Sequence, residues 1–403
     1  MAVVADWSKL PKELLYLISE RLHIDIDLIH FRSVCSHWRT SSITSCNTLH
    51  FKLPFLKYNI DRYNTLHINN NNNNNNTSSF SYYYLSKCSH FLIKPPSQQQ
   101  LDQTLVRPPW LVQITKNSSD KTIFFHPQFS YSLPSYDFRL THLDFNKLSV
   151  IHLGTDFFIE NGSMHPKKVV AVTPLILAIL LDNNRLALFR CCRWTVIPDL
   201  PWSIGDICVF KGWIYAIQLH GRLTVTVGPE DLSVRLVANP GGMGDRNLLV
   251  ESEGELLLVE SFWFESTIDD VLRINVFRLD EKYKKWELTS LGNRILFMRN
   301  GCSFSASALD LSVAKGNRVI FMDNRCILLN KICDNASGMY VFDLDQGRVS
   351  PLSDYPDYLN LFWPPPEWIG KSYMPTLKKR AKQRKRTRDT TLGSCANHGS
   401  MQL

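Results

Sequence analysis

The stretch GDICVFKGWIYAIQL (Gly205–Leu219) continues, after a short turn, into LTVTVGPEDLSVRLV (Leu223–Val237). Each half holds two short runs of apolar and β-branched residues, separated by polar or Gly-containing turns. Runs of this length bounded by turn residues indicate strands, and tight turns between them indicate hairpins. Because His220-Gly221 joins the two halves, the whole stretch predicts four antiparallel strands in one sheet.

The same two-hairpin pattern recurs along the chain. The copies are Ile176–Pro201, Asn247–Ser261 with Ile274–Gly292, and Ala308–Asp323 with Met339–Leu352. A unit of four strands that repeats every roughly 40–60 residues is typical of a β-propeller, in which each sheet buries its faces between its neighbours. Three units are clear, one is fair, and one or two degenerate units lie between Phe80 and Glu160. We therefore expect about five or six blades.

These strands determine the predicted organisation of the chain, which is α+β and mainly β. Short apolar runs and turn residues fill 80–369, the predicted propeller domain. Residues 46–79 are predicted to be a linker, because they are polar and contain eight consecutive Asn at Asn69–Asn76. Residues 370–403 have no apolar period, so we expect a disordered tail there.

The N-terminal stretch DWSKLPKELLYLISERLHIDIDLIHFRSVCSHWRT (Asp6–Thr40) has the period of helices instead. Its apolar residues recur at three- and four-residue steps: Leu14, Leu17, Ile18 and Leu22, then Leu28, Phe31, Val34, Cys35 and Trp38. This spacing predicts two or three short amphipathic helices within 6–45. A unit of roughly 40 residues buries too little surface to fold unaided. We therefore expect it to share its apolar faces with the rest of the chain or with another protein.

The segments LPKELLYLISERL and DLIHFRSVCSHWR resemble an F-box, whose pattern begins Leu-Pro then Glu-Leu-Leu and ends Val-Cys-x-x-Trp-Arg. The resemblance implies that the helices dock on a Skp-type adaptor and through it join a cullin/RING ubiquitin ligase. The alternative is an ordinary helical hairpin packed on its own domain. The residues that the resemblance assigns to adaptor binding are Leu10, Pro11, Glu13, Leu14, Leu17, Ile18, Leu22, Phe31, Val34, Cys35 and Trp38.

Four segments of the β region carry a second resemblance. They are RPPWLVQI (Arg107–Ile114), GNRVIFMDN (Gly316–Asn324), GMYVFDLDQGRVSPL (Gly338–Leu352) and FWPPPEWI (Phe362–Ile369). Together they resemble the kelch-related propeller domain of plant F-box proteins, although residues 115–165 match less well. The resemblance implies a subunit of a ligase whose propeller binds a target protein. It also implies that the Asn tract is an insertion.

The composition is that of a globular protein with a core, with 403 residues of which 44% are apolar and 11% aromatic. No apolar run reaches the roughly 18–20 residues of a membrane helix, and the start MAVVADWSK lacks the features of a signal peptide. We therefore expect no membrane partner and a location in the nucleus, the cytoplasm or both. The ten Cys are scattered without a CxxC pair, which predicts reduced, mostly buried thiols, no metal site and no cofactor.

Catalytic motifs such as GxSxG, HExxH and GxxxxGK[ST] are absent from the sequence. The Gly-rich stretch Pro240–Gly244 lacks a following helix, which favours a hairpin connection. The acidic pairs Asp269-Asp270 and Asp343 with Asp345 occur at turn positions, which favours solvated turns over paired acid–base work. We therefore assign no catalytic residue and expect no enzymatic activity of the chain itself.

The formal net charge of +8 comes from one short run, KKRAKQRKRTR. Without its eight basic residues the chain has 37 Lys and Arg against 37 Asp and Glu. A dense basic cluster suits a nuclear import receptor, whereas the lack of interleaved aromatic residues disfavours nucleic acid. A solvated run without a receptor is the other alternative. The import candidates are Lys378, Lys379, Arg380, Lys382, Arg384, Lys385, Arg386 and Arg388.

Two hypotheses for function follow from these patterns. The first is a substrate-recognition subunit of an SCF-type E3 ubiquitin ligase, in which the helices bind the adaptor and the propeller binds an unknown target protein. The second is a nuclear β-propeller scaffold whose N-terminal helices pack internally. An enzyme on a propeller scaffold has only the fold in its favour, and a fold does not establish a function.

Overall fold

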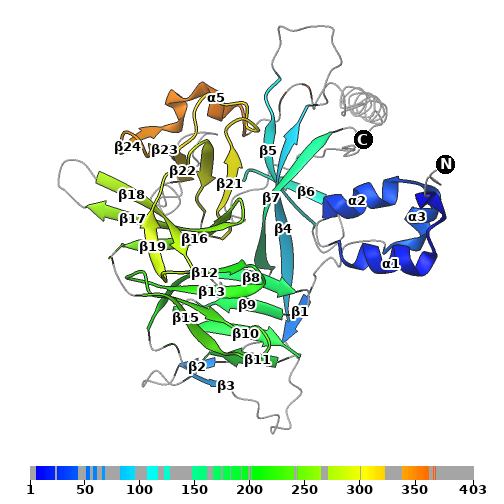
Figure 1. The fold of residues 1–403 in the computed structure, drawn as a ribbon, viewed down its shortest axis with the longest axis horizontal. Coiled ribbons are helices and arrows are strands. Elements are labelled where there is room, and N and C mark those ends of the chain that lie inside the picture. The colour runs from blue at the N-terminus through cyan, green and yellow to red at the C-terminus, as the bar shows by residue number, and fades with distance from the viewer. Residues whose placement is uncertain are drawn as a thin grey trace, which may run out of the picture.

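The structure is a computed structural model (Figure 1). The residues that it describes are 6–22, 25–43, 51–54, 58–60, 66–68, 82–95, 107–116, 122–127, 148–160, 167–173, 176–181, 183–191, 193–197, 200, 202–239, 242, 244–264, 271–299, 301–322, 338–362, 366 and 368.

Short helices form the N-terminal unit, as the periodicity predicts (Figure 1). They are η1 (Trp7–Lys9), α1 (Lys12–Glu20), α2 (Asp25–Ser33) and α3 (Ser36–Ser41). Pro11 occupies the N-cap of α1, where its missing N–H leaves no helical bond unmade. Helix α3 packs against both α1 and α2. Within the described part of the chain, no helix is long and apolar enough to cross a membrane.

The first sheet, called blade 1, contains the longest strands. They are β1 (Phe51–Pro54), β4 (Tyr82–Lys94), β5 (Trp110–Lys116), β6 (Thr122–Phe125) and β7 (Ser149–Glu160). Strand β4 pairs with β7 along one edge, and with β1 and then β5 along the other. Strand β1 lies inside the range expected to be linker, and a hairpin of β2 (Tyr58–Ile60) and β3 (Leu66–Ile68) follows it.

Three four-stranded antiparallel sheets follow in chain order as blades 2, 3 and 4. Blade 2 contains β8 (Lys168–Thr173), β9 (Ile176–Leu180), β10 (Leu186–Arg190) and β11 (Arg193–Val196). Blade 3 contains β12 (Ile204–Phe210), β13 (Trp213–Gln218), β14 (Thr224–Val227) and β15 (Val234–Ala238). Blade 4 contains β16 (Arg246–Ser252), β17 (Glu255–Phe264), β18 (Val271–Asp280) and β19 (Lys285–Leu288). Gly212 and Gly254 make tight turns at φ of +79° and +77°, a backbone conformation that favours glycine.

The last sheet, blade 5, has a different strand order from the others. Its strands are β20 (Arg294–Phe297), β21 (Phe304–Ser307), β22 (Arg318–Met322), β23 (Met339–Asp343) and β24 (Arg348–Pro351). They lie in the order β21-β20-β22-β23-β24, and β20 runs parallel to β22. Two short helices, η3 (Leu352–Asp354) and α5 (Pro356–Leu359), follow the sheet.

The innermost strands of the five sheets form a closed circle. Strand β7 packs on β8, β8 on β12, β12 on β16, β16 on β21, and β21 on β7 again. The chain is therefore a five-bladed β-propeller with an N-terminal helical unit, within the predicted range of five or six blades. Separate clusters of buried apolar side chains fill the seams from blade 1 round to blade 5 and back. Each fully buried Leu or Phe contributes about 1.5–3 kcal/mol.

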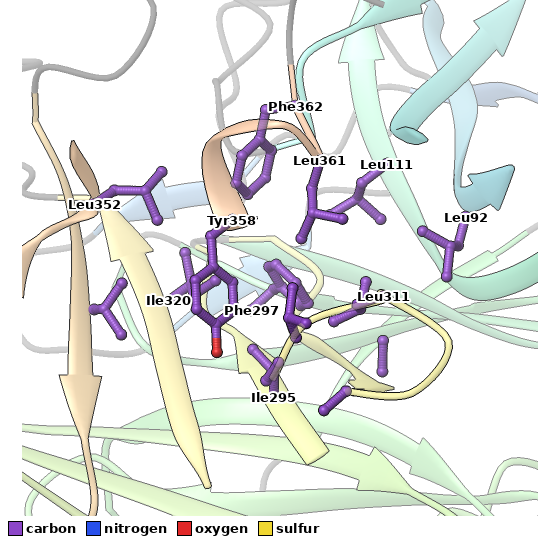
Figure 2. Close-up of a cluster of buried hydrophobic side chains, with 14 of the residues drawn as sticks. Leu92, Leu111, Ile295, Phe297, Leu311, Ile320, Leu352, Tyr358, Leu361 and Phe362 are labelled. Carbon is purple, nitrogen blue, oxygen red and sulfur yellow. The ribbon is translucent and has the colours of Figure 1, made fainter. Parts of the chain in front are cut away.

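The seam between blade 5 and blade 1 closes the ring, and Figure 2 shows its cluster. Leu92 and Leu111 of blade 1 meet Phe297 and Ile320 of blade 5 in this cluster. Leu361 and Phe362, which follow α5, also belong to this cluster. Closure therefore depends on side chains from both ends of the propeller domain rather than on a strand shared between them.

Three residues beyond α5 hold this seam, and we call Leu361, Phe362 and Trp368 the closing residues. The backbone N–H of Leu111 donates to the carbonyl of Leu361 over 2.7 Å. The indole Nε1 of Trp368 donates to the carbonyl of Pro108 over 2.9 Å. Trp368 is buried among blade 1 residues that include Trp110. The two end motifs of the family resemblance therefore contact each other.

Two residues of the β20–β21 connection contact blade 1 across the same seam. Arg299 Nη1 lies 3.1 Å from His90 Nε2 and 3.1 Å from Gln113 Oε1. A Cβ added at Gly301 would collide with the carboxylate of Asp156 on β7. A larger residue at position 301 would therefore force the Asp156 carboxylate to move.

Two sequence predictions about local structure are wrong. Ala308–Val313 was predicted as a strand, but it forms turns in which Leu311 N donates to Ser307 O and Val313 N donates to Ala308 O. Its buried apolar residues serve the blade 5–blade 1 seam instead of a ladder. The Gly-rich stretch Pro240–Gly244 joins β15 to β16. It therefore connects two blades and is not a hairpin turn.

Candidate functional site

The inner side of the N-terminal helical unit is a small apolar core. Leu15 of α1 is fully buried, and Leu28 and Phe31 of α2 are buried as well. The ring of Phe31 lies 4.5 Å, centroid to centroid, from the ring of Trp38 on α3. These four side chains therefore hold the helices to one another.

Polar contacts fix the chain before α1 and after α3. Trp38 Nε1 donates to the carbonyl of Trp7 over 3.1 Å, and His37 Nε2 lies 3.0 Å from the carbonyl of Leu10. The backbone N–H of Ile43 donates to Ser19 Oγ over 3.1 Å. The helical unit is thus tied at both of its ends, which gives its outer surface a defined shape.

The outer side of α1 exposes three large apolar residues. Leu14, Leu17 and Ile18 are 47%, 50% and 41% exposed. Because they are three and four residues apart, they lie on one face of the helix, and we call them the α1 face. Val34, between α2 and α3, is also exposed. An apolar face of this kind in water favours a site that another protein covers.

The other predicted adaptor-binding residues fall into two groups. Pro11 and Glu13 are exposed at the start of α1, whereas Leu10, Leu22 and Cys35 are half-buried. Cys35 Sγ accepts a hydrogen bond from Trp38 N over 3.5 Å and so caps α3. The structure thus separates residues that are open to a partner from residues that build the unit. It contains no partner chain, so their docking role stays a prediction.

Three exposed residues of this unit were missed from the sequence. Trp7, Tyr16 and Ile29 are large, apolar or aromatic, and exposed. Tyr16 falls outside the three- and four-residue steps of α1, and Trp7 precedes the first helix, so periodicity does not find them. Ile29 follows a buried Leu directly, and only the position of the helix in space reveals its exposure.

The basic run at 378–388 lies outside the described residues. Its assignment to nuclear import therefore stays a prediction.

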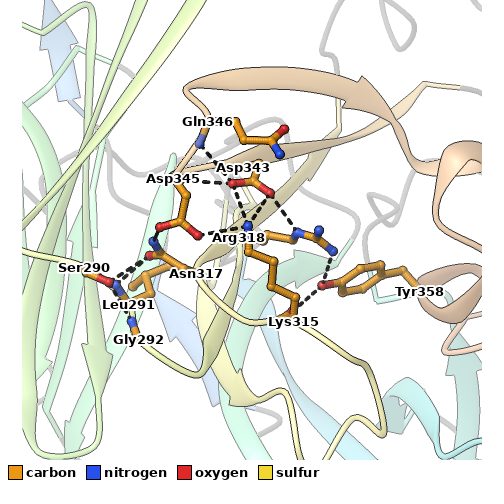
Figure 3. A network of polar contacts seen from close by, with 10 residues as sticks. All are labelled: Ser290, Leu291, Gly292, Lys315, Asn317, Arg318, Asp343, Asp345, Gln346 and Tyr358. Atoms are coloured by element: carbon orange, nitrogen blue, oxygen red, sulfur yellow. Dashed lines mark hydrogen bonds and ion pairs between the residues drawn. The ribbon is translucent and has the colours of Figure 1, made fainter.

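A polar network in blade 5 surrounds Asp343 at the end of β23 (Figure 3). Its carboxylate accepts hydrogen bonds from Lys315 Nζ over 3.0 Å and from Arg318 Nε over 3.3 Å. Burial opposes ionisation of Asp343, but these bonds outweigh it, so the pKa of Asp343 lies below its usual value. Tyr358 Oη donates to Lys315 O over 2.7 Å. Asp343 is therefore buried and structural, not the solvated turn residue that we expected.

A buried ion pair lies between the innermost strands. Lys168 of β8 and Asp206 of β12 are 2.9 Å apart and both buried. Burial lowers the pKa of Lys168, but the Asp206 carboxylate more than offsets this, so its pKa is raised. Asp206 also accepts the backbone N–H of Leu249 on β16 over 2.8 Å. One carboxylate thus links blades 2, 3 and 4 near the axis of the ring.

Side chains suited to chemistry near this ion pair are held in unreactive forms. Burial raises the pKa of the Cys208 and Cys302 thiols to about 12, so both stay protonated and are poor nucleophiles at neutral pH. Of the five described cysteines, Cys88 is buried, Cys191 is exposed and the others are half-buried as whole residues. The expectation of mostly buried thiols therefore holds for Cys88 and for the thiol groups of Cys208 and Cys302, but not for Cys191. Among the described residues, no group of three or more His, Cys, Asp or Glu is arranged to hold a metal ion.

Comparison with known proteins identifies a family model that matches the propeller and relatives that match most of the chain. The model of the KIB1-4 beta-propeller family matches residues 76–343. F-box protein SKIP23 of Arabidopsis thaliana is 30% identical over 91% of this chain and 96% of its own length. F-box protein At2g17036 of the same plant is 31% identical over the same shares. A putative F-box/kelch-repeat protein of this plant, At5g24040, is 25% identical over 91% of this chain and 99% of its own length.

The family model covers most of the propeller, the two relatives match 91% of the chain, and together they confirm the family that the sequence motifs predicted. The chain therefore belongs to the F-box proteins that carry a KIB1-4 β-propeller.

Proposed function

We propose that this protein is the substrate-recognition subunit of an SCF-type E3 ubiquitin ligase. The helical unit docks on a Skp-type adaptor, and the propeller binds a target protein. The chain performs no chemistry itself. It raises the effective concentration of the target's lysines near the conjugating enzyme that a cullin/RING assembly recruits.

The α1 face carries this proposal. Leu14, Leu17 and Ile18 are each about half exposed on α1, whereas Leu15 of the same helix is buried in the core of the helical unit. Burying one such side chain at an interface gives up to about 1.5–3 kcal/mol. A partner that covers the face therefore offsets the marginal stability of so small a unit. The names of the relatives, which are F-box proteins, support the same assignment.

In the scaffold alternative, the helical unit is part of the propeller's own packing. If the helices existed to complete the propeller, removing them would unfold it. The principal packing of α3 is against α1 and α2, and β1 enters blade 1 only from Phe51 onward. A truncation that begins just before Phe51 and still unfolds cooperatively counts against the scaffold hypothesis.

The variant Leu14→Asp tests the proposed function. We expect loss of adaptor binding by at least about 100-fold, because docking would bury an unpaired charge. The folded state should be retained, since Leu14 is 47% exposed in the free chain. The measurement is co-purification and binding titration of the full chain with a Skp-type adaptor.

A matched control for this test is Leu309→Asp, which makes the same change at a residue 80% exposed on blade 5. It should bind the adaptor as the unmodified chain does. If the unmodified chain fails to bind any Skp-type adaptor, or if both variants bind equally well, the proposed function is wrong.

A further inference from the structure

An exposed basic and aromatic surface spans the outer edge of blades 3 and 4. We call it the rim patch, and its residues are Lys211, Trp213, Arg235, Lys282, Tyr283, Lys284 and Lys285. They come from the β12–β13 turn with the start of β13, from β15, and from the β18–β19 turn with the start of β19. Two contacts make these segments one surface. Lys211 Nζ lies 3.0 Å from Glu281 Oε1, and Asn239 N donates to Lys284 O over 3.1 Å.

Tyr283 of the rim patch is displayed to solvent in a fixed position. Tyr283 is 62% exposed at the tip of its turn. The carboxylate of Asp280 accepts the backbone N–H groups of Lys282 and Tyr283, each over 3.0 Å. This fixes the tip, so little conformational entropy remains to be lost when a partner binds.

Cationic side chains lie over the aromatic rings of the rim patch. Lys282 Nζ and Lys285 Nζ are 5.1 Å and 5.4 Å from the centroid of the Tyr283 ring. The guanidinium of Arg235 is 5.2 Å from the ring of Trp213. Tyr, Trp and Arg are the residue types most enriched among the energetically dominant positions of protein interfaces. The rim patch therefore has the composition of a protein-binding surface.

The charge of the rim patch indicates what it binds. Glu281 and Glu287 are paired with Lys211 and Lys285. Lys282 and Lys284 form no ion pair with any described residue. Two cations beside an exposed aromatic ring thus suit carboxylates that flank a bulky apolar side chain. The interleaved Glu281 and Glu287 would repel the continuous phosphate backbone of a nucleic acid.

We propose that the rim patch docks an acidic segment of the target protein, with a bulky side chain of that segment against Tyr283. The identity of the partner as a ubiquitination target rests on the proposed function. The docking chemistry does not, because it follows from the charges and rings of blades 3 and 4 alone.

A defined peptide tests the docking chemistry. The probe is a short fluorescent peptide rich in Glu with a central Phe, titrated into the purified full chain. We expect saturable binding that weakens as salt rises. The double variant Lys282→Glu, Tyr283→Ala should weaken it at least about tenfold. The control Arg348→Glu, Leu309→Ala makes the same kinds of change on exposed residues of blade 5 and should leave it unchanged.

Three results overturn the rim-patch proposal: no peptide binding, equal weakening in both double variants, or tighter binding of a single-stranded DNA probe than of the peptide. Adaptor binding is measured on the same samples. If the adaptor binds and the peptide does not, the rim patch fails and the proposed function stands. If the peptide binds and the adaptor does not, the proposed function fails instead.

Photo-crosslinking extends the test to the natural partner. A photoreactive amino acid replaces Tyr283 in one chain and Leu309 in another, and the crosslinked peptides from cells are sequenced. We expect Tyr283 to capture segments with a clear excess of Asp and Glu around a bulky apolar residue. Segments without that excess, or the same yield and sequences from both positions, would refute the proposed docking chemistry.

Discussion

His126 shows how burial sets the protonation state of single residues in this propeller. It is buried in blade 1, and its ring stacks on Phe362 with centroids 5.0 Å apart. Burial, with a smaller effect of Arg299, lowers the pKa of His126 to about 3. Burial also lowers the pKa of His90 well below its usual value, beside the same Arg299. Both histidines are therefore neutral in the folded protein at neutral pH.

This neutral state makes the propeller sensitive to acid. The unfolded chain takes up a proton on His126 below about pH 6.5, whereas the folded chain does so only near pH 3. Stability is therefore fully present above pH 6.5 and falls as pH drops from 6.5 toward 3. The expected loss is about 1.4 kcal/mol per pH unit for each such histidine.

The variant His126→Phe keeps an aromatic ring against Phe362 and removes the titration. We expect chemical unfolding to show a shallower fall in stability between about pH 7 and pH 5. His220→Phe, at the exposed β13–β14 turn, is the matched control for losing a histidine. An unchanged slope in His126→Phe would contradict the assignment of acid sensitivity to this residue.

Helix α1 divides two neighbouring leucines between folding and binding. Leu15 is fully buried and Leu14 is 47% exposed, because successive residues of a helix point about 100° apart. The sequence predicted which residues belong to the helical unit. It did not predict which of these residues are buried and which are exposed, because neighbouring residues such as Leu14 and Leu15 are equally apolar. The inside of the unit was set by the packing of α3 on α1 and α2.

We expect Leu15→Ala to destabilise the helical unit by about 2–5 kcal/mol, since it leaves a cavity in the core. Amide hydrogen exchange in α1, α2 and α3 should accelerate, while exchange in blades 2 to 4 stays the same. Leu17→Ala, which trims the exposed α1 face, should weaken adaptor binding without this acceleration. Equal acceleration in both variants would show that Leu17 is part of the core.

The strands differ in how clearly the sequence predicts them. Gly205–Val237 was predicted as four strands and forms β12 to β15, because its apolar runs are long and its turns are marked by glycine. Strands β20 and β21, each four residues long, were missed, although β14 has the same length and was predicted. Their neighbour Ala308–Val313 has apolar residues at strand-like spacing, but it folds as turns because Leu311 and Val313 serve the seam cluster. The local sequence pattern does not show that these side chains pack in a seam between two blades.

At the scale of the whole molecule, the ring has one seam that differs from the others. Blades 1 to 5 follow one another along the chain, so chain connectivity helps to hold four of the five seams together. The seam between blades 5 and 1 relies on the closing residues and on Arg299. The sequence identified both end motifs as family features, but that Trp368 contacts Pro108 could be seen only in the structure.

Trp368→Ala tests this seam. We expect a loss of about 3–5 kcal/mol and faster amide exchange in β5 and β21 than in β13 and β17. The control is Trp286→Ala, because Trp286 is buried in the seam between blades 3 and 4 and donates to Thr224 Oγ1 over 3.0 Å. There the faster exchange should appear in β13 and β17 instead. The same exchange pattern in both variants would argue against a separate closing seam.

The position of Trp368 also has a consequence for how the protein is made. The helical unit is complete in sequence by Ile43, but the ring cannot close until Trp368 has left the ribosome. At about 5–20 residues per second, the chain between them takes roughly 15–65 s to synthesise. From the synthesis of Glu160 at the end of blade 1 until that of Trp368, the nascent chain presents the α1 face together with the uncovered apolar side of blade 1. A chaperone or an early-binding partner has that time in which to reach both.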